Sequence, residues 1–203
     1  MTDHDTPDDE RPDLGPQARL VARLAGRVTD EQLAAPTPCP AYAVRHLLGH
    51  LLGLAGAFRL AAGKELGPAL DQDPGSVTPD VGPGWRAELP DALDGLARAW
   101  RDPAAWQGMT RAGGIDLPGG VAGLVALDEL VVHGWDLARA TGQEYAPDAA
   151  SLDAARALLT PAADGDGDGG GLFGAPVPVP DGAPLLDRVI GLSGRDPRWT
   201  PAR

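Results

Sequence analysis

Apolar residues recur every three or four positions in four separate segments of this chain, and no segment alternates apolar with polar residues. The spacing of three and four places side chains on one face of an α-helix, whereas alternation marks a half-buried strand. The four segments are residues 14–28, 43–62, 89–100 and 121–140. Each can bury an apolar stripe against its neighbours, so the pattern predicts an all-α domain with four principal helices.

Proline and glycine separate these segments. Residues 64–84 and 102–120 are rich in both, and we predict irregular connections there. Four helices joined by connections of that length form a bundle with at least one crossover. Two shorter helices are predicted over residues 149–159 and 184–190.

The chain divides by composition into three parts. Residues 1–13 are acidic, contain two prolines and lack apolar periodicity, so we predict a disordered lead. Residues 14–160 are predicted to form the helical bundle. Residues 161–203 read as a Gly/Pro-rich loop followed by a C-terminal tail that packs on the bundle.

Acidic residues outnumber basic ones 29 to 17, which gives a formal charge of −12. That balance repels phosphate backbones and anionic lipid, so neither a nucleic acid nor a membrane is the expected partner. The single cysteine, Cys39, excludes an intramolecular disulfide, and we interpret it as a packing residue rather than a nucleophile. The sequence lacks a signal-peptide pattern and an apolar run of roughly 20 residues, so a cytoplasmic location is expected.

The fourth helical segment carries a polar stripe. Glu129 and His133 are four residues apart, which places both on one helix face, and Asp136 continues that face. Because Val125 and Val132 adjoin the stripe, we expect it to face inward, where an unpaired charge is costly. A divalent metal would compensate for that cost, and these side chains offer donors that suit Zn²⁺. The alternative, on spacing alone, is a Glu–His pair near the surface.

The second helical segment adds a third donor. His50 lies between leucines and is expected to face inward, whereas His46 stands beside Arg45 at the helix start and is expected to be solvated. Two histidines and one glutamate leave coordination positions open, which is typical of a reactive metal site. Asp136 is expected to hydrogen-bond one of the imidazoles. An exposed charge, or a partner for Arg139, is the alternative role for Asp136.

Three blocks of the sequence resemble a known family. They are residues 37–50 (TPCPAYAVRHLLGH), 128–143 (DELVVHGWDLARATGQ) and 173–197 (FGAPVPVPDGAPLLDRVIGLSGRDP). Together they resemble the actinobacterial DinB-like metal-binding proteins, which are related to the N-terminal domain of mycothiol-dependent maleylpyruvate isomerase. The likeness extends over residues 14–199.

The resemblance implies a DinB-like four-helix bundle with long crossover connections and a short C-terminal helical tail. It also implies a divalent metal on two histidines and a glutamate, which correspond here to His50, Glu129 and His133. Members with known chemistry use the metal to bind a low-molecular-weight thiol such as mycothiol, and carry out transferase or isomerase reactions.

Several functions fit these residues. A metal-dependent transferase or isomerase would exploit the loss of a proton from a coordinated thiol near neutral pH. A hydrolase would use the same open site to activate water. A non-catalytic metal- or ligand-binding bundle, or an internal hydrogen-bond network without metal, is the alternative. The donor set favours Zn²⁺, with Ni²⁺ or Fe²⁺ also compatible. A small-molecule substrate or thiol is the expected partner, and a homodimer is a common state for such bundles.

Overall fold

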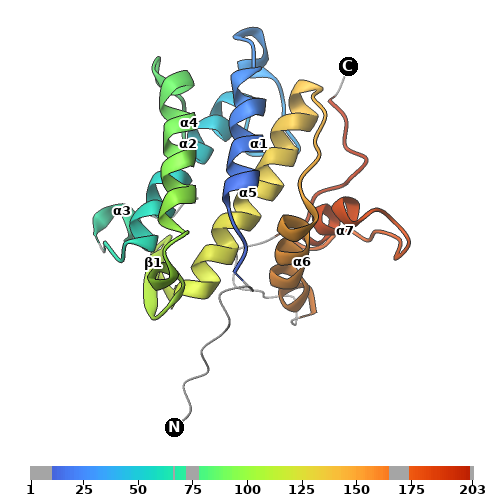
Figure 1. Cartoon of the computed structure of the whole chain (residues 1–203). Helices are drawn as coiled ribbons and strands as arrows, with labels where there is room; N and C mark the ends of the chain where they lie inside the picture. The colour runs from blue at the N-terminus through green and yellow to red at the C-terminus, as the bar shows by residue number, and fades with distance from the viewer. Residues whose placement is uncertain (1–10, 66, 72–77, 165–173, 202–203) are drawn as a thin grey trace.

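The computed structural model describes residues 11–65, 67–71, 78–164 and 174–201. Helices dominate these residues, as the apolar spacing predicts (Figure 1). The elements in chain order, with η for a 3₁₀ helix, are α1 (Gly15–Gly26), η1 (Glu31–Ala34), α2 (Val44–Ala62), α3 (Pro68–Asp71), α4 (Trp85–Ala99), η3 (Pro103–Trp106), β1 (Met109–Ala112), β2 (Ile115–Pro118), α5 (Gly119–Thr141), α6 (Ala149–Asp164) and α7 (Leu185–Leu192).

Four of these helices form the bundle. Helices α1 and α2 each pack against both α4 and α5, so the chain crosses the bundle between α1 and α2 and again between α4 and α5. Leucines fill the interior, and those that are fully buried within the four helices are Leu47, Leu48, Leu51, Leu89, Leu93, Leu96, Leu127, Leu130 and Leu137. The prediction of an all-α four-helix bundle with long crossover connections is confirmed.

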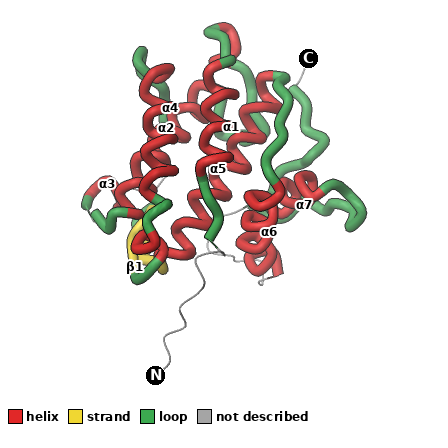
Figure 2. The backbone as a smooth tube through the Cα atoms, in the orientation of Figure 1, coloured by secondary structure: helices red, strands yellow, loops and turns green. Residues whose placement is uncertain are grey.

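The connection between α4 and α5 differs from the prediction of an irregular segment. It contains an antiparallel hairpin in which Met109 pairs with Pro118 and Ala112 with Ile115 (Figure 2). Gly113 and Gly114 both have positive φ, as a tight two-residue hairpin turn requires. The Gly-Gly pair was the sequence signal, but strands of four residues are too short to show a convincing alternation.

The C-terminal part of the chain adds two helices to one side of the bundle. Helix α6 packs on α5, and α7 packs on α6 (Figure 1). The Arg139 guanidinium of α5 donates to the carbonyl oxygen of Pro197, which fastens the end of the tail to the bundle. Residues 1–10 of the predicted lead and 165–173 of the predicted loop lie outside the described residues, so the domain division stays a prediction.

None of the helices in the described ranges combines the length and the apolar character that a transmembrane span requires.

The crossover that precedes α4 lies directly on α2 at Gly49. A Cβ atom at this glycine would lie 2.9 Å from the backbone nitrogen and carbonyl carbon of Asp80. The Arg45 guanidinium, one turn earlier on α2, forms an ion pair with the Asp80 carboxylate. The absence of a side chain at Gly49 therefore lets the crossover lie against the helix one residue before His50.

We predict that Gly49→Ala lowers the free energy of unfolding by about 1–3 kcal/mol, because the added methyl group overlaps the crossover backbone. Gly53→Ala on the same helix is the matched control, since a Cβ there meets nothing within 4 Å. The control should raise the free energy of unfolding by up to about 1 kcal/mol through helix propensity. Urea denaturation of both variants measures these changes, and equal effects would contradict the proposed contact.

Candidate metal centre

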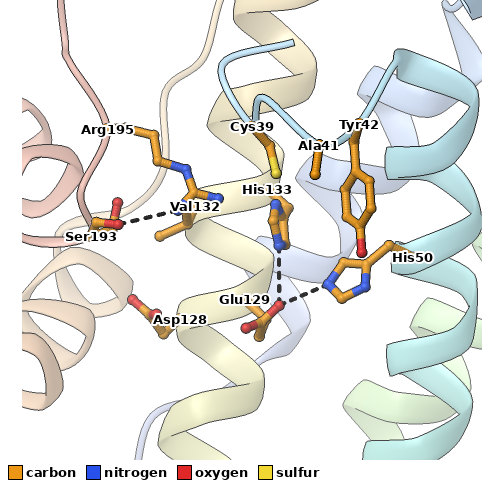
Figure 3. A pocket seen from close by; sticks show the side chains of 10 residues that line it. All are labelled: Cys39, Ala41, Tyr42, His50, Asp128, Glu129, Val132, His133, Ser193 and Arg195. Atoms are coloured by element: carbon orange, nitrogen blue, oxygen red, sulfur yellow. Dashed lines mark hydrogen bonds and ion pairs between the residues drawn. The ribbon is translucent and has the colours of Figure 1, made fainter. Parts of the chain in front are cut away.

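Three side chains from two packed helices converge on one point. His50 comes from α2, and Glu129 and His133 lie one turn apart on α5 (Figure 3). The Nε2 atoms of His50 and His133 lie 3.1 and 3.2 Å from the same oxygen, Oε2 of Glu129. One candidate ligand atom from each residue can be chosen so that all lie within 4.8 Å of one another. The structure therefore brings together the three residues predicted as metal ligands.

The cluster is partly open to solvent. The side chains of His133, His50 and Glu129 are 9%, 16% and 25% exposed, respectively. The two imidazole rings meet edge to face with centroids 4.7 Å apart, and the ring of Tyr42 lies 5.5 Å from that of His50. The cluster is thus held by packing and remains accessible to a small molecule.

Asp136 orients one of the two imidazoles. Its Oδ2 atom lies 2.9 Å from Nδ1 of His133, and its side chain is fully buried. A proton on Nδ1 donated to this carboxylate leaves Nε2 as the ring atom that faces Glu129. Arg195, from the tail after α7, donates to the same Asp136 oxygen at 3.3 Å. Asp136 is therefore neither exposed nor paired with Arg139, the two alternatives that spacing allowed.

Hydrogen bonds determine the protonation of the cluster. Burial alone would raise the pKa of Glu129, but hydrogen bonds from His133 and His50, together with their charge, hold it well below its usual range. Burial alone would lower the pKa of His133, but hydrogen bonds to Asp136 and Glu129, together with their charge, raise it to about 9. At neutral pH the metal-free cluster thus contains a proton on His133 that a cation would replace.

The cluster forms part of the wall of a cavity of about 230 Å³. Cys39 and Tyr42, from the loop before α2, line one side, and Ser193 and Arg195 line the other (Figure 3). Asp128 completes the lining next to Glu129 on α5. Burial raises the pKa of Asp128 to about 8, and the neighbouring charge of Glu129 acts in the same direction.

The structure also places His46 and Cys39, which the sequence predicts to be a solvated histidine and a packing residue, respectively. The Nδ1 atom of His46 accepts a hydrogen bond from the backbone nitrogen of Ala43 at 3.3 Å, so this half-buried histidine caps the start of α2 and lies outside the cluster. Cys39 is half-buried at the cavity wall rather than in the core. Burial raises the pKa of its thiol, which keeps it protonated at neutral pH.

Sequence reasoning missed four polar side chains of this cavity, which are those of Tyr42, Asp128, Ser193 and Arg195. Asp128 adjoins the predicted ligand Glu129, but helical spacing placed it off the polar stripe. Arg195 reaches Asp136 across 59 positions of sequence. Its one signal was its place in the block of residues 173–197 that supports the family resemblance.

Comparisons with known proteins agree with the resemblance. Residues 14–138 match the family model described as the mycothiol maleylpyruvate isomerase N-terminal domain. Two uncharacterized proteins from strains of Mycobacterium tuberculosis are each 28% identical over 181 residues, which is 87% of this chain and 92% of each relative. Crystal structures of the mycothiol-dependent maleylpyruvate isomerase and of a histidine-to-alanine variant are 23% identical, with TM-scores of 0.44 and 0.46. These matches cover 79% of this chain and 72% of each solved chain.

The raised pKa of His133 predicts how the stability of the metal-free protein depends on pH. The folded state binds this proton more tightly than the unfolded chain, whose histidines titrate near 6.5. The contribution of His133 is complete below about pH 6.5 and is lost as the pH rises toward 9, by at most about 1.4 kcal/mol per pH unit. In His133→Gln this part of the decrease should disappear.

Urea denaturation in the presence of a chelator, at several pH values from about 6 to 10, measures this difference. The raised pKa of Asp128 also lowers stability with pH, but between about 4 and 8, and it is present in both proteins. If the two stability curves ran parallel above pH 6.5, the proposed hydrogen bonding of His133 would be wrong.

Proposed function

Because the chain belongs to the mycothiol maleylpyruvate isomerase N-terminal domain family, we propose that it is a divalent-metal protein that uses a low-molecular-weight thiol in a transferase or isomerase reaction. One observation carries the proposal: two imidazoles and one carboxylate from α2 and α5 converge at an accessible cavity. The ligands are His50, Glu129 and His133. Asp136 orients His133 from behind.

The donor chemistry supports a divalent cation. Two histidine nitrogens and one carboxylate oxygen form the set that catalytic zinc sites use, with a coordination position left open. Three acidic side chains, those of Asp128, Glu129 and Asp136, lie around the cluster against one basic side chain, that of Arg195, and this excess of acidic groups favours a cation. Zn²⁺ is our first choice, and Ni²⁺ and Fe²⁺ accept the same donors.

A bound cation would lower the pKa of a thiol or water molecule in contact with it. Family membership favours the thiol, and mycothiol is the thiol that the family description names. The chain's own cysteine is a poor source of that sulfur, because burial raises the pKa of Cys39. The activated sulfur would therefore belong to a bound small molecule.

The residues of the chain have separate roles in this proposal. His133 would release its Nε2 proton when a cation binds, while its Nδ1–H group continues to donate a hydrogen bond to Oδ2 of Asp136. Arg195 donates a hydrogen bond to Asp136 and so helps to hold the Asp136 side chain in place behind His133. Tyr42 packs beside His50 and shields that side of the cluster from water. The cavity of about 230 Å³ accommodates the sulfur-bearing end of a ligand and a few neighbouring atoms.

The metal content of the protein tests the proposed ligands. Untagged protein should bind one divalent cation per chain, and His50→Ala and His133→Ala should each lower the affinity by more than about a hundredfold, because each removes a direct ligand. His46→Ala is the matched control, because this histidine lies on the same helix but outside the cluster. Elemental analysis and competition with a chromophoric chelator measure the affinities. Equal losses in His46→Ala and His50→Ala would contradict the assignment.

Turnover of a thiol-dependent reaction tests the proposed activity. Zinc-loaded protein mixed with mycothiol and a panel of electrophilic substrates should give conjugation or isomerisation that depends on both the metal and the thiol. Glu129→Gln should abolish it, because the amide cannot supply the anionic oxygen that holds the cation. Product formation is followed by mass spectrometry. Chelation that lowers the melting temperature, with no turnover by the loaded protein across the panel, would favour a non-catalytic metal-binding bundle, and thiol-independent hydrolysis would favour a hydrolase.

A further inference from the structure

Asp128 is a buried residue that lines the cavity. The residue is 2% exposed, and its Oδ1 atom has no hydrogen-bond partner within the part of the chain that the structure describes. Buried side-chain acceptors in folded proteins are normally satisfied, so an exception in the wall of a cavity needs an explanation. A ligand that donates a hydrogen bond provides one.

The neighbouring polar groups are already engaged elsewhere. Arg195 donates through Nη2 to Asp136 and through Nη1 to the carbonyl oxygen of Ser193. The hydroxyl group of Ser193 donates to the backbone oxygen of Ile190. Glu129 is held between two imidazoles. None of these groups forms a hydrogen bond with Asp128, whose side chain lines the cavity and whose Oδ1 atom is buried without a partner in the described residues (Figure 3).

The helix places Asp128 beside the cluster but not in it. Residues 128 and 129 are consecutive on α5 and differ by about 100° in direction. Glu129 points toward His50 on α2, whereas Asp128 points toward the side of the cavity that the C-terminal tail closes (Figure 3). A ligand held at the cluster that extends toward this side of the cavity would meet Asp128.

We propose that Asp128 accepts a hydrogen bond from an N–H group of the bound thiol, a few bonds from its sulfur, so that the cavity selects amino- or amidothiols over thiols without such a donor. This inference rests on the proposed use of a thiol. A carboxyl group can accept a hydrogen bond in either protonation state, so the selection does not depend on its charge. A site built around an unused acceptor discriminates against a ligand that leaves it unsatisfied.

Two thiols that differ in a single group test this inference. N-acetylcysteamine carries an amide N–H, and 2-mercaptoethyl acetate has an ester oxygen in its place. Isothermal titration of the zinc-loaded protein measures both dissociation constants. We expect the amide thiol to bind about tenfold or more tightly, the factor that one hydrogen bond to a carboxyl group provides.

Variants assign the preference to one side chain. Asp128→Leu removes the acceptor with little change in shape, and the ratio of the two dissociation constants should fall to about one. Circular dichroism shows whether the leucine disturbs folding. If it does, Asp128→Ala makes the same test with a smaller side chain. Ser193→Ala is the control in the C-terminal tail, and it should keep the ratio because the Ser193 hydroxyl group donates to the backbone oxygen of Ile190.

The outcomes separate this inference from the proposed function. If both thiols bind wild-type protein equally, or if the ratio is unchanged in the Asp128 variants, the recognition role of Asp128 is overturned while thiol binding stands. If neither thiol binds the zinc-loaded protein, the proposed use of a thiol is overturned, and the inference with it. A ratio that is lost in the Asp128 variants and kept in Ser193→Ala establishes the role.

Discussion

The packing of α2 against α5 is the constraint on which the site depends, because it brings the imidazole of His50 to a carboxylate that another imidazole already shares. Glu129 sits between His50 and His133 at 3.1 and 3.2 Å. Neither histidine nor the glutamate could be buried alone without a large cost, and together they satisfy one another. The same geometry that stabilises the metal-free cluster would offer three ligand atoms to a cation, and in our proposal the cation would displace the proton on His133.

The C-terminal tail belongs to this arrangement through Arg195. Asp136 is fully buried in the bundle interior, and its charge is balanced by His133 on one side and by Arg195 on the other. Burying a carboxyl group with a single partner costs free energy, so the second partner, Arg195, helps to stabilise Asp136 in the interior. Arg195 also closes one wall of the cavity. The orientation of His133 and the shape of the site are therefore both coupled to a segment about sixty residues away in sequence.

The parts of this structure that could be predicted are those that local periodicity encodes. Helical spacing located α2 and α5 because their buried faces are rich in leucine and valine, and the same spacing put Glu129, His133 and Asp136 on one face of α5. His50 lies between leucines, so the same reasoning predicted that its side chain faces inward. Arg195 could not be found this way, because its contact with Asp136 is purely tertiary. The hairpin of β1 and β2 was not predicted because its strands are too short to show an alternation of apolar and polar residues.

Asp128 is the residue for which folding alone offers no reason. An apolar side chain at this position would avoid the desolvation of a carboxyl group that forms no hydrogen bond within the described chain, so the fold would gain stability by replacing it. Its neighbours Glu129 and Asp136 are costly too, but each finds partners within the protein. Functional sites are where proteins retain such unfavourable groups, because a ligand can satisfy them. One helix thus carries three acidic residues with different partners: two imidazoles for Glu129, His133 and Arg195 for Asp136, and, in our proposal, a ligand for Asp128.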